Sequence, residues 1–244
     1  MTTRQRIDDT HGFVLHTYPW RETSLIVETF TREHGRLPLM AKGARRPGSA
    51  VRGVLMAFQP LAVSWTGKSE VKTLTGAYWL GGQALLCGIG LLCGYYLNEL
   101  LLRLLPREDP HPVLFDRYAA TIRALAEGAP TAPLLRSFEL ALLQELGYGL
   151  TLDVLADTGE VVQPDGRYWF VAERGVLEAH DEMGDSAAQG SLLDGHVLLA
   201  MASDDFSGTD TLAQAKGLMR RLLQHHLGGQ QLESRRILIE LQEL

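Results

Sequence analysis

The sequence predicts an α+β protein, with a small β-barrel at the N-terminus and a mainly α-helical region after it. Two observations lead to this prediction. Between residues 10 and 80, five short strand-like segments alternate with turns rich in glycine. After Gly81 and Gly82 a long apolar stretch begins, and later segments carry apolar residues at helical spacing. We therefore expect a nucleic-acid-binding barrel domain at residues 1–80 and an α-helical C-terminal domain at residues 81–244.

The predicted barrel is of the five-stranded OB type. Five strands in about 70 residues favour this fold, which commonly carries single-stranded nucleic acid, although strand count alone does not separate it from other small barrels. Residues 1–9 are polar and are expected to be frayed, and residues 19–22 are expected to form a turn. The predicted strands cover residues 13–18, 24–31, 36–42, 60–66 and 71–78.

Alternation in the third predicted strand assigns its two faces. Leu37, Leu39 and Ala41 share one face and are expected to point into the core. The other face carries Pro38 and Met40 between two cations at its ends, so both cations point away from the core. These two cations are Arg36 and Lys42.

Charge is distributed unevenly along the chain, whose net charge is −6. Residues 1–80 hold 11 Lys and Arg against 6 Asp and Glu, a net of +5, whereas residues 81–244 hold 12 against 23, a net of −11. Such asymmetry indicates a basic binding module attached to an acidic body. No Asp or Glu occurs between Glu33 and Glu70.

This acid-free window contains a basic loop at residues 41–52, whose centre is rich in glycine and proline. A flexible basic loop beside strands suits a polyanion such as nucleic acid. Two other interpretations stay open: a solvated surface loop, and a local pair between Arg36 and Glu33. The residues expected to hold DNA phosphates are Arg36, Lys42, Arg45, Arg46, Arg52 and Lys72.

The sequence of the second region predicts helices around a small β insertion. The uncharged apolar stretch at residues 84–97 is too short to span a bilayer and is typical of a buried core helix. Asp210 is expected to cap a helix at 211–227, on whose polar side Lys216, Arg220 and Arg221 could extend a DNA track. Helices are expected at 84–105, 112–127, 130–147, 192–201, 211–227 and 232–244, strand-like pieces at 167–172 and 175–177, and a polar loop at 180–191.

The sequence shows little that is typical of catalysis. It has no phosphate-binding glycine motif between a strand and a helix. Ser186 faintly resembles an esterase nucleophile but lacks the strand–turn–helix context, and His225 and His226 are read as surface histidines. Cys87 and Cys93 would not face each other on a helix, so a reducing, cytoplasmic location is expected. We infer a binding protein rather than an enzyme.

Short motifs in one order along almost the whole chain carry a family resemblance. They are FVLHTYPWRETSLIV at 13–27, TREHGR at 31–36, AKGARR at 41–46, FQPL at 58–61, EVKTL at 70–74, NEL at 98–100, LR at 135–136, FEL at 138–140, LGYG at 146–149, LGG at 227–229 and SR at 234–235. Each motif is weak alone, but together they are specific. On these residues the chain resembles the bacterial RecO family of recombination-repair proteins.

The resemblance implies an OB barrel, an α-helical C-terminal domain and a role as a recombination mediator. Such proteins bind single- and double-stranded DNA and anneal complementary strands. They contact the C-terminal tail of single-stranded-DNA-binding protein, and with RecR they load RecA in the bacterial cytoplasm, at the nucleoid. The resemblance also implies that Arg136, beside Phe138, meets the acidic tail; an ordinary surface arginine is the alternative.

One feature departs from the family pattern. Many relatives have a four-cysteine zinc site in the region that corresponds to residues 151–180, but this chain has no cysteine there. Leu155 and Ala156 stand at the place of the first ligand. We therefore expect no zinc and no other cofactor, and a β insertion held by packing of Tyr168, Trp169 and Phe170.

Two other functions stay open from the sequence. The protein could be chiefly a protein-interaction adaptor whose DNA affinity is incidental, as the −11 charge of residues 81–244 suggests. A small hydrolase with Ser186 as its nucleophile is a remote third hypothesis.

Overall fold

The computed structural model describes residues 6–148, 150–179 and 190–242. The chain folds into two compact units, one formed by residues 1–129 with 232–244 and the other by residues 130–231. The predicted boundary after residue 80 follows the change from strands to helices rather than this contact boundary, and it stays a prediction.

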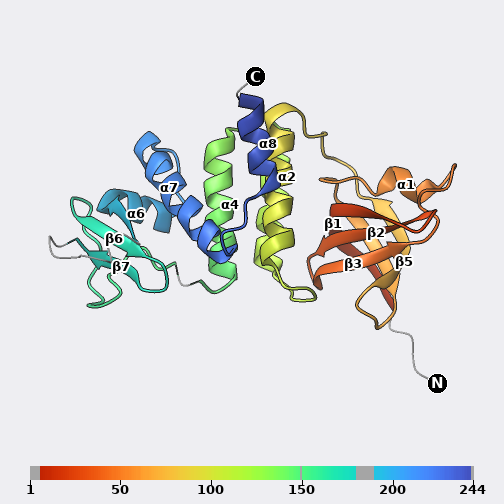
Figure 1. Ribbon diagram of the computed structural model, residues 1–244, viewed down its shortest axis with the longest axis horizontal. Coiled ribbons are helices and arrows are strands. Elements are labelled where there is room, and N and C mark those ends of the chain that lie inside the picture. The colour runs from red at the N-terminus through yellow and green to blue at the C-terminus, as the bar shows by residue number, and fades with distance from the viewer. Residues whose placement is uncertain (1–5, 149, 180–189, 243–244) are drawn as a thin grey trace. The chain divides into compact units, whose positions relative to one another are not determined.

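The first unit begins with a closed five-stranded barrel, as predicted (Figure 1). The strands are hydrogen-bonded in the order β1-β2-β3-β5-β4, with β3 and β5 parallel and the other neighbours antiparallel. A closed barrel leaves no long unpaired strand edge. The strands are β1 (Arg6–Trp20), β2 (Ser24–Thr31), β3 (Gly35–Ala41), β4 (Leu61–Thr66) and β5 (Lys72–Trp79).

The barrel interior is filled by alternate residues of each strand. Leu37, Leu39 and Ala41 of β3 are buried in it, which confirms the predicted faces of this strand. The short helix α1 (Ala50–Val54) lies at one end of the barrel and packs Val51 and Val54 against the same core (Figure 1).

Strand β1 is longer at both ends than the sequence predicts. Arg6 and Ile7 pair with Thr66 and Trp65 of β4, so the prediction of frayed residues is wrong for residues 6–9. At the other end β1 continues to Trp20, and the turn falls at residues 21–23 instead of 19–22. Backbone pairing with β4 and β2 decides the two ends of this strand.

Two helices pack on the outside of the barrel, α2 (Gly88–Leu104) and α3 (Pro112–Ala126). The Phe13 and Phe30 rings lie 5.1 and 6.1 Å from the Tyr118 ring of α3. The Tyr118 hydroxyl donates to Oδ1 of Asn98 at 2.6 Å, and Nδ2 of Asn98 donates to the carbonyl oxygen of Leu15 at 2.9 Å. Burial raises the pKa of Tyr118, which keeps this hydroxyl a donor.

The helix predicted from residue 84 begins only at Gly88. Its N-cap residue, Cys87, has an extended backbone, and Gly88 has a positive φ of 51°. Near the other end of α2, the Glu99 carboxylate accepts hydrogen bonds from the backbone N–H groups of Glu233 and Ser234 at 3.0 and 2.9 Å. Glu99 thereby caps the first turn of α8 (Glu233–Gln242).

The second unit combines helices with a small antiparallel sheet of order β7-β6-β8. Of the three residues expected to hold the insertion by packing, Tyr168 and Phe170 of the central strand are buried and Trp169 is half-buried. The strands are β6 (Arg167–Val171), β7 (Gly175–Glu178) and β8 (Ser191–Asp194). The helices are α4 (Thr131–Glu145), α6 (Gly195–Ala202) and α7 (Thr209–His226).

Two local predictions in the second unit are wrong. Residues 191–194 form a strand, and the helix predicted from residue 192 begins at Gly195, because β6 pairs with this segment. Asp210 does not cap α7: the N-cap is Gly208, and the Asp210 carboxylate instead accepts from the Gln214 amide at 3.2 Å. Pairing and side-chain contacts outweigh the local cap preference at these positions.

Candidate nucleic-acid interface

The basic loop follows β3 directly and is built from consecutive turns. The backbone N–H of Arg46 donates to the carbonyl oxygen of Gly43 at 3.0 Å, and that of Ser49 donates to Arg46 at 3.1 Å. Gly43 and Gly48 have positive φ values of 70° and 77°, which favour glycine over residues with a Cβ. This chain of turns leads into α1 and explains why the loop holds two glycines.

The loop is tied to the turn between β1 and β2. The backbone N–H of Arg45 donates to the carbonyl oxygen of Thr23 at 2.8 Å, and Nη1 of Arg45 lies 3.4 Å from the carbonyl oxygen of Arg21. Ala44 is buried in the barrel core. The prediction of a flexible loop therefore needs correction, because backbone bonds and a buried side chain hold its first half in place.

Four of the predicted phosphate-binding residues are solvent-exposed on this loop and on α1: Lys42, Arg45, Arg46 and Arg52. Across residues 6–148, 150–179 and 190–242, no carboxylate forms an ion pair with any of these four cations. Their charge is therefore not neutralised within the described part of the chain. An anion can reach them from solvent without breaking a salt bridge.

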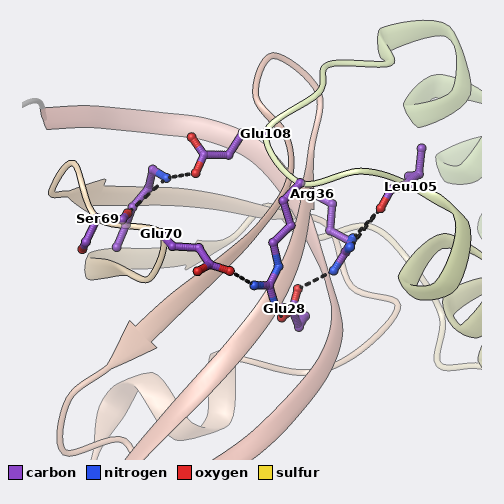
Figure 2. A network of polar contacts seen from close by, with 8 residues as sticks. Glu28, Arg36, Ser69, Glu70, Leu105 and Glu108 are labelled. Carbon is purple, nitrogen blue, oxygen red and sulfur yellow. Dashed lines mark hydrogen bonds and ion pairs between the residues drawn. The ribbon is translucent and has the colours of Figure 1, made fainter.

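The fifth predicted residue, Arg36, is held in a network (Figure 2). Its Nη1 lies 3.1 Å from Oε2 of Glu28, and its Nε and Nη2 donate to the carbonyl oxygen of Leu105 at 3.1 and 2.9 Å. The side chains of Arg36 and Glu28 are only 13% and 4% exposed. The sequence analysis considered Glu33 as a partner, but the carboxylate that binds Arg36 is Glu28.

Arg107 completes this network. Its Nη2 lies 2.6 Å from Oε1 of Glu28, and its Nη1 pairs with Glu70. Burial alone would lower the pKa of Arg107, but attraction to Glu28 and the hydrogen bonds outweigh burial and raise it. The buried Glu28 carboxylate is thus bound by two guanidinium groups.

The segment that carries Arg107 lies directly on β3. A Cβ at Gly35 would stand 2.0 Å from the carbonyl oxygen of Asp109, and the backbone N–H of Glu108 donates to Arg36 at 2.8 Å. The sixth predicted residue, Lys72, is also paired here: its Nζ lies 2.5 Å from Oε1 of Glu108, and its side chain is 11% exposed. Arg36 and Lys72 therefore lie with the covering segment, apart from the four exposed cations.

The two predicted tail-binding residues lie on α4 in the second unit. Nη2 of Arg136 is 2.5 Å from Oε1 of Glu139, and the Arg136 side chain is 13% exposed. Phe138 is fully buried. In this structure Arg136 has an acidic partner of its own, and Phe138 is a core residue.

The sequence analysis missed three exposed residues next to the basic loop. Arg21 lies in the turn that Arg45 contacts, and its φ is 51°. Tyr18 and Trp20 are 46% and 41% exposed on β1. The alternation of His16, Tyr18 and Trp20 in the sequence indicates that these rings share a strand face. The prediction of a turn at Trp20 did not use this pattern.

Other candidate sites in the second unit consist of polar side chains that could bind a metal or take part in catalysis. The ligand atoms of Asp194, His196 and Asp210 lie within 4.8 Å of one another, but the Gln214 amide already donates to both carboxylates. His226 stacks on Tyr148 with ring centroids 3.5 Å apart. Ser186 lies outside the residues that the structure describes, so the structure offers no side-chain geometry by which to judge the hydrolase hypothesis.

Comparison with known proteins covers the whole chain. The family model described as "Recombination protein O N terminal" matches residues 6–82, and "Recombination protein O C terminal" matches residues 88–236. A protein named DNA repair protein RecO from Azoarcus sp. (strain BH72) is 58% identical over the full length of both chains. Proteins of the same name from Aromatoleum aromaticum and Paraburkholderia xenovorans are 56% and 54% identical; the match covers 100% of both chains for the first, and 98% of this chain and 79% of the relative for the second.

The fold defines the class: a closed OB-type barrel with an exposed basic loop, followed by a helical region with a small sheet. The same class is indicated by both family models. It is also indicated by the two relatives that are 58% and 56% identical to this chain. The chain belongs to the RecO family of DNA repair proteins. Among its described helices, none has the length and apolar character needed to cross a bilayer.

Proposed function

We propose that this protein is a recombination mediator that binds single- and double-stranded DNA and anneals complementary strands. On this proposal it acts with RecR and with the tail of single-stranded-DNA-binding protein to load RecA, in the bacterial cytoplasm at the nucleoid. Membership of the RecO family supports the general role in DNA repair. The chemistry of the barrel surface supports the DNA-binding and annealing steps, and the proposed tail contact concerns residues of α4.

The exposed basic loop is the observation that carries the DNA-binding proposal. Lys42, Arg45, Arg46 and Arg52 offer cations that need not leave a carboxylate to meet a phosphate. Arg36 and Lys72 are also part of the proposed set, but they would have to exchange Glu28 and Glu108 for DNA. The loop is therefore expected to supply most of the binding energy.

Annealing follows from charge neutralisation. Two complementary strands repel each other through their phosphates, and cations that bind both lower this repulsion. The step makes and breaks no covalent bond, so it requires neither ATP nor a catalytic residue. Arg can also stack on bases, which helps to hold a strand while it searches for its complement.

The test compares wild type with Arg45→Ala/Arg46→Ala at two salt concentrations. Each lost phosphate contact should reduce the slope of log affinity against log salt by about 0.7 on single strands and about 0.9 on duplex. We expect weaker binding, a shallower slope and slower ATP-independent annealing. Arg220→Ala/Arg221→Ala on α7 removes the same charge from another exposed surface and serves as the control.

Unchanged affinity and slope in Arg45→Ala/Arg46→Ala would refute the assignment of the loop. An equal loss in the α7 control would instead indicate that the DNA track includes Arg220 and Arg221, and Lys216→Ala would then test the third cation of this helix.

The proposed tail contact concerns Arg136 and Phe138 on α4. A terminal carboxylate would have to compete with Glu139 for Arg136, and the Glu139 side chain, only 1% exposed, would then lose this cation. Phe138 is fully buried, so the tail contact assigned to it would require that α4 expose this ring. Arg136→Ala should weaken binding of the acidic tail peptide.

The adaptor function remains the second candidate because residues 81–244 carry a net charge of −11. An adaptor with incidental DNA affinity would keep its repair activity after Arg45→Ala/Arg46→Ala and lose it when partner binding is lost.

A further inference from the structure

The outer face of β1, β2 and β3 is covered at one end and open at the other. At the covered end, Phe13 and Phe30 pack against the aromatic rings of α3. Next along the face, the segment with Arg107 covers Glu28 and Arg36. Beyond Glu28, His16, Tyr18 and Trp20 on this face are exposed to solvent.

The open end carries aromatic rings at alternate positions of β1. His16, Tyr18 and Trp20 are all exposed and, two residues apart, they share one face of the strand. The His16 and Tyr18 rings are in contact, with centroids 4.5 Å apart and an edge-to-face angle of 63°. This contact limits the ring rotation that a ligand would otherwise have to restrict.

Strand register continues this surface toward the cations. Tyr18 lies opposite Ile26, and Ile26 lies opposite Met40, so two half-buried apolar side chains extend the aromatic row. Trp20 lies opposite Ser24 on β2, and the next residue of β2, Leu25, lies opposite Ala41, the last residue of β3, which Lys42 follows. Adjacent strands are about 4.8 Å apart, so the backbone ends of β1 and β3 at Trp20 and Ala41 are separated by roughly 10 Å.

The turn after Trp20 brings further cations to the same place. It contains Arg21 and is the turn to which Arg45 is hydrogen-bonded. Glu22 is the one carboxylate in this turn, and it is exposed. Large exposed rings normally cost solubility, and their place beside uncompensated cations fits a ligand that has both flat apolar faces and negative charge.

We propose that His16, Tyr18 and Trp20 form a stacking platform for unpaired bases while the basic loop holds the phosphates of the same strand. Tyr18 and Trp20 are about 7 Å apart along β1, so each ring can stack on a different base. A duplex hides its base faces inside its own stack and cannot use such a platform. The platform therefore makes single strands the preferred ligand of this surface.

This inference rests on the proposed DNA-binding function, and the experiment distinguishes failure of the platform from failure of that function. Binding is measured to an oligothymidylate, to an abasic oligonucleotide of the same length and to a duplex. The abasic strand keeps the sugar-phosphate backbone and lacks bases, so it reports the basic loop alone. The variants are Tyr18→Ala/Trp20→Ala, Trp20→Phe and Arg45→Ala/Arg46→Ala.

Wild type should bind oligothymidylate more tightly than the abasic strand. Tyr18→Ala/Trp20→Ala should lose that preference, with a decrease of about 5- to 150-fold for each stacked base, and should keep its abasic and duplex affinity and its salt slope. Trp20→Phe should retain most of the preference because a flat ring remains. Trp79→Ala, which removes a ring that is 59% exposed at another part of the barrel, is the matched control and should change nothing.

A base preference that survives in Tyr18→Ala/Trp20→Ala overturns the platform, whatever else these rings contact. If Arg45→Ala/Arg46→Ala still weakens binding to all three ligands, the proposed DNA-binding function stands without the platform. If the arginine variant changes none of the affinities but the aromatic variant loses the base preference, the platform stands and the proposed role of the loop fails. Thermal unfolding of Tyr18→Ala/Trp20→Ala and Trp20→Phe should match wild type and exclude misfolding.

Discussion

Arg36 and Lys42 show at the scale of single residues how burial decides what a cation does. Arg36 lies on β3 and Lys42 directly follows this strand, yet the side chain of Arg36 is 13% exposed and bound to Glu28, whereas Lys42 is exposed. A buried carboxylate without a cation is costly, so Arg36 is bound to a structural partner. Lys42 has no such partner in the described chain and keeps its charge for a ligand.

This difference gives a prediction for Arg36→Ala. Breaking a buried pair costs about 3–5 kcal/mol, and here Arg107 still binds Glu28, so we expect a loss of roughly 2–3 kcal/mol in the free energy of unfolding. Urea denaturation measures it. Lys42→Ala is the control and should stay within about 0.5 kcal/mol of wild type. Equal stability of the two variants would show that the Glu28 network contributes little.

At the scale of elements, α8 is attached to α2 by one carboxylate. Glu99 accepts from the backbone N–H groups of Glu233 and Ser234 and from the Ser234 hydroxyl at 2.7 Å. Burial alone would raise the pKa of Glu99, but these hydrogen bonds and the charge of Arg103 outweigh burial and lower it. The cap therefore joins two helices through residues that are 134 positions apart in the chain, Glu99 and Glu233.

The lowered pKa of Glu99 makes this attachment dependent on pH. Its contribution to stability is complete above the ordinary glutamate pKa and is lost as the pH falls through the lower folded-state pKa. Hydrogen-exchange protection of the Glu233 and Ser234 amides, corrected for intrinsic exchange, should therefore fall in acid. Glu99→Gln should lower this protection at neutral pH and leave little further change in acid. Glu127→Gln, at the exposed C-cap of α3, should behave as wild type. Protection that is independent of pH in wild type would contradict the prediction.

Contacts between elements also explain why the basic loop is ordered despite its high positive charge. Its charged side chains point to solvent, and its order comes from backbone bonds to the β1–β2 turn and from the buried Ala44. No side-chain salt bridge is needed, so none of the exposed cations is consumed in holding the loop.

At the scale of the whole molecule, the charge is divided between a basic barrel region and an acidic remainder. The net charge of −6 disfavours a general attraction to DNA, so we expect the proposed DNA binding to depend on the local potential of the barrel surface. Screening acts over about 8–10 Å at moderate salt, which limits repulsion from distant acids.

This division predicts separate loss of two binding functions. Arg45→Ala/Arg46→Ala should lose most DNA affinity and keep binding of the acidic tail peptide, whereas Arg136→Ala should do the opposite. Fluorescence anisotropy with labelled oligonucleotide and labelled peptide measures both. Loss of both functions in either single-site variant would argue against independent surfaces, and an annealing activity that survives the first variant would favour the adaptor reading.

The sequence by itself determined the fold class and the family. Alternation at Leu37, Leu39 and Ala41 predicted the inward face of β3, and helical spacing at Tyr118 and Ile122 predicted α3, because side-chain period follows backbone geometry. The acid-free window also located the exposed cations, since the absence of local acids is visible in the chain itself.

Only the tertiary structure decided which cations are available. Glu28 and Arg107 are 79 residues apart, and Lys72 and Glu108 are 36 apart, so no local pattern pairs them. The aromatic row on β1 likewise became visible only when register extended the strand to Trp20. Burial and pairing depend on contacts between distant segments, and these contacts turned two of the six predicted DNA cations into partners of carboxylates.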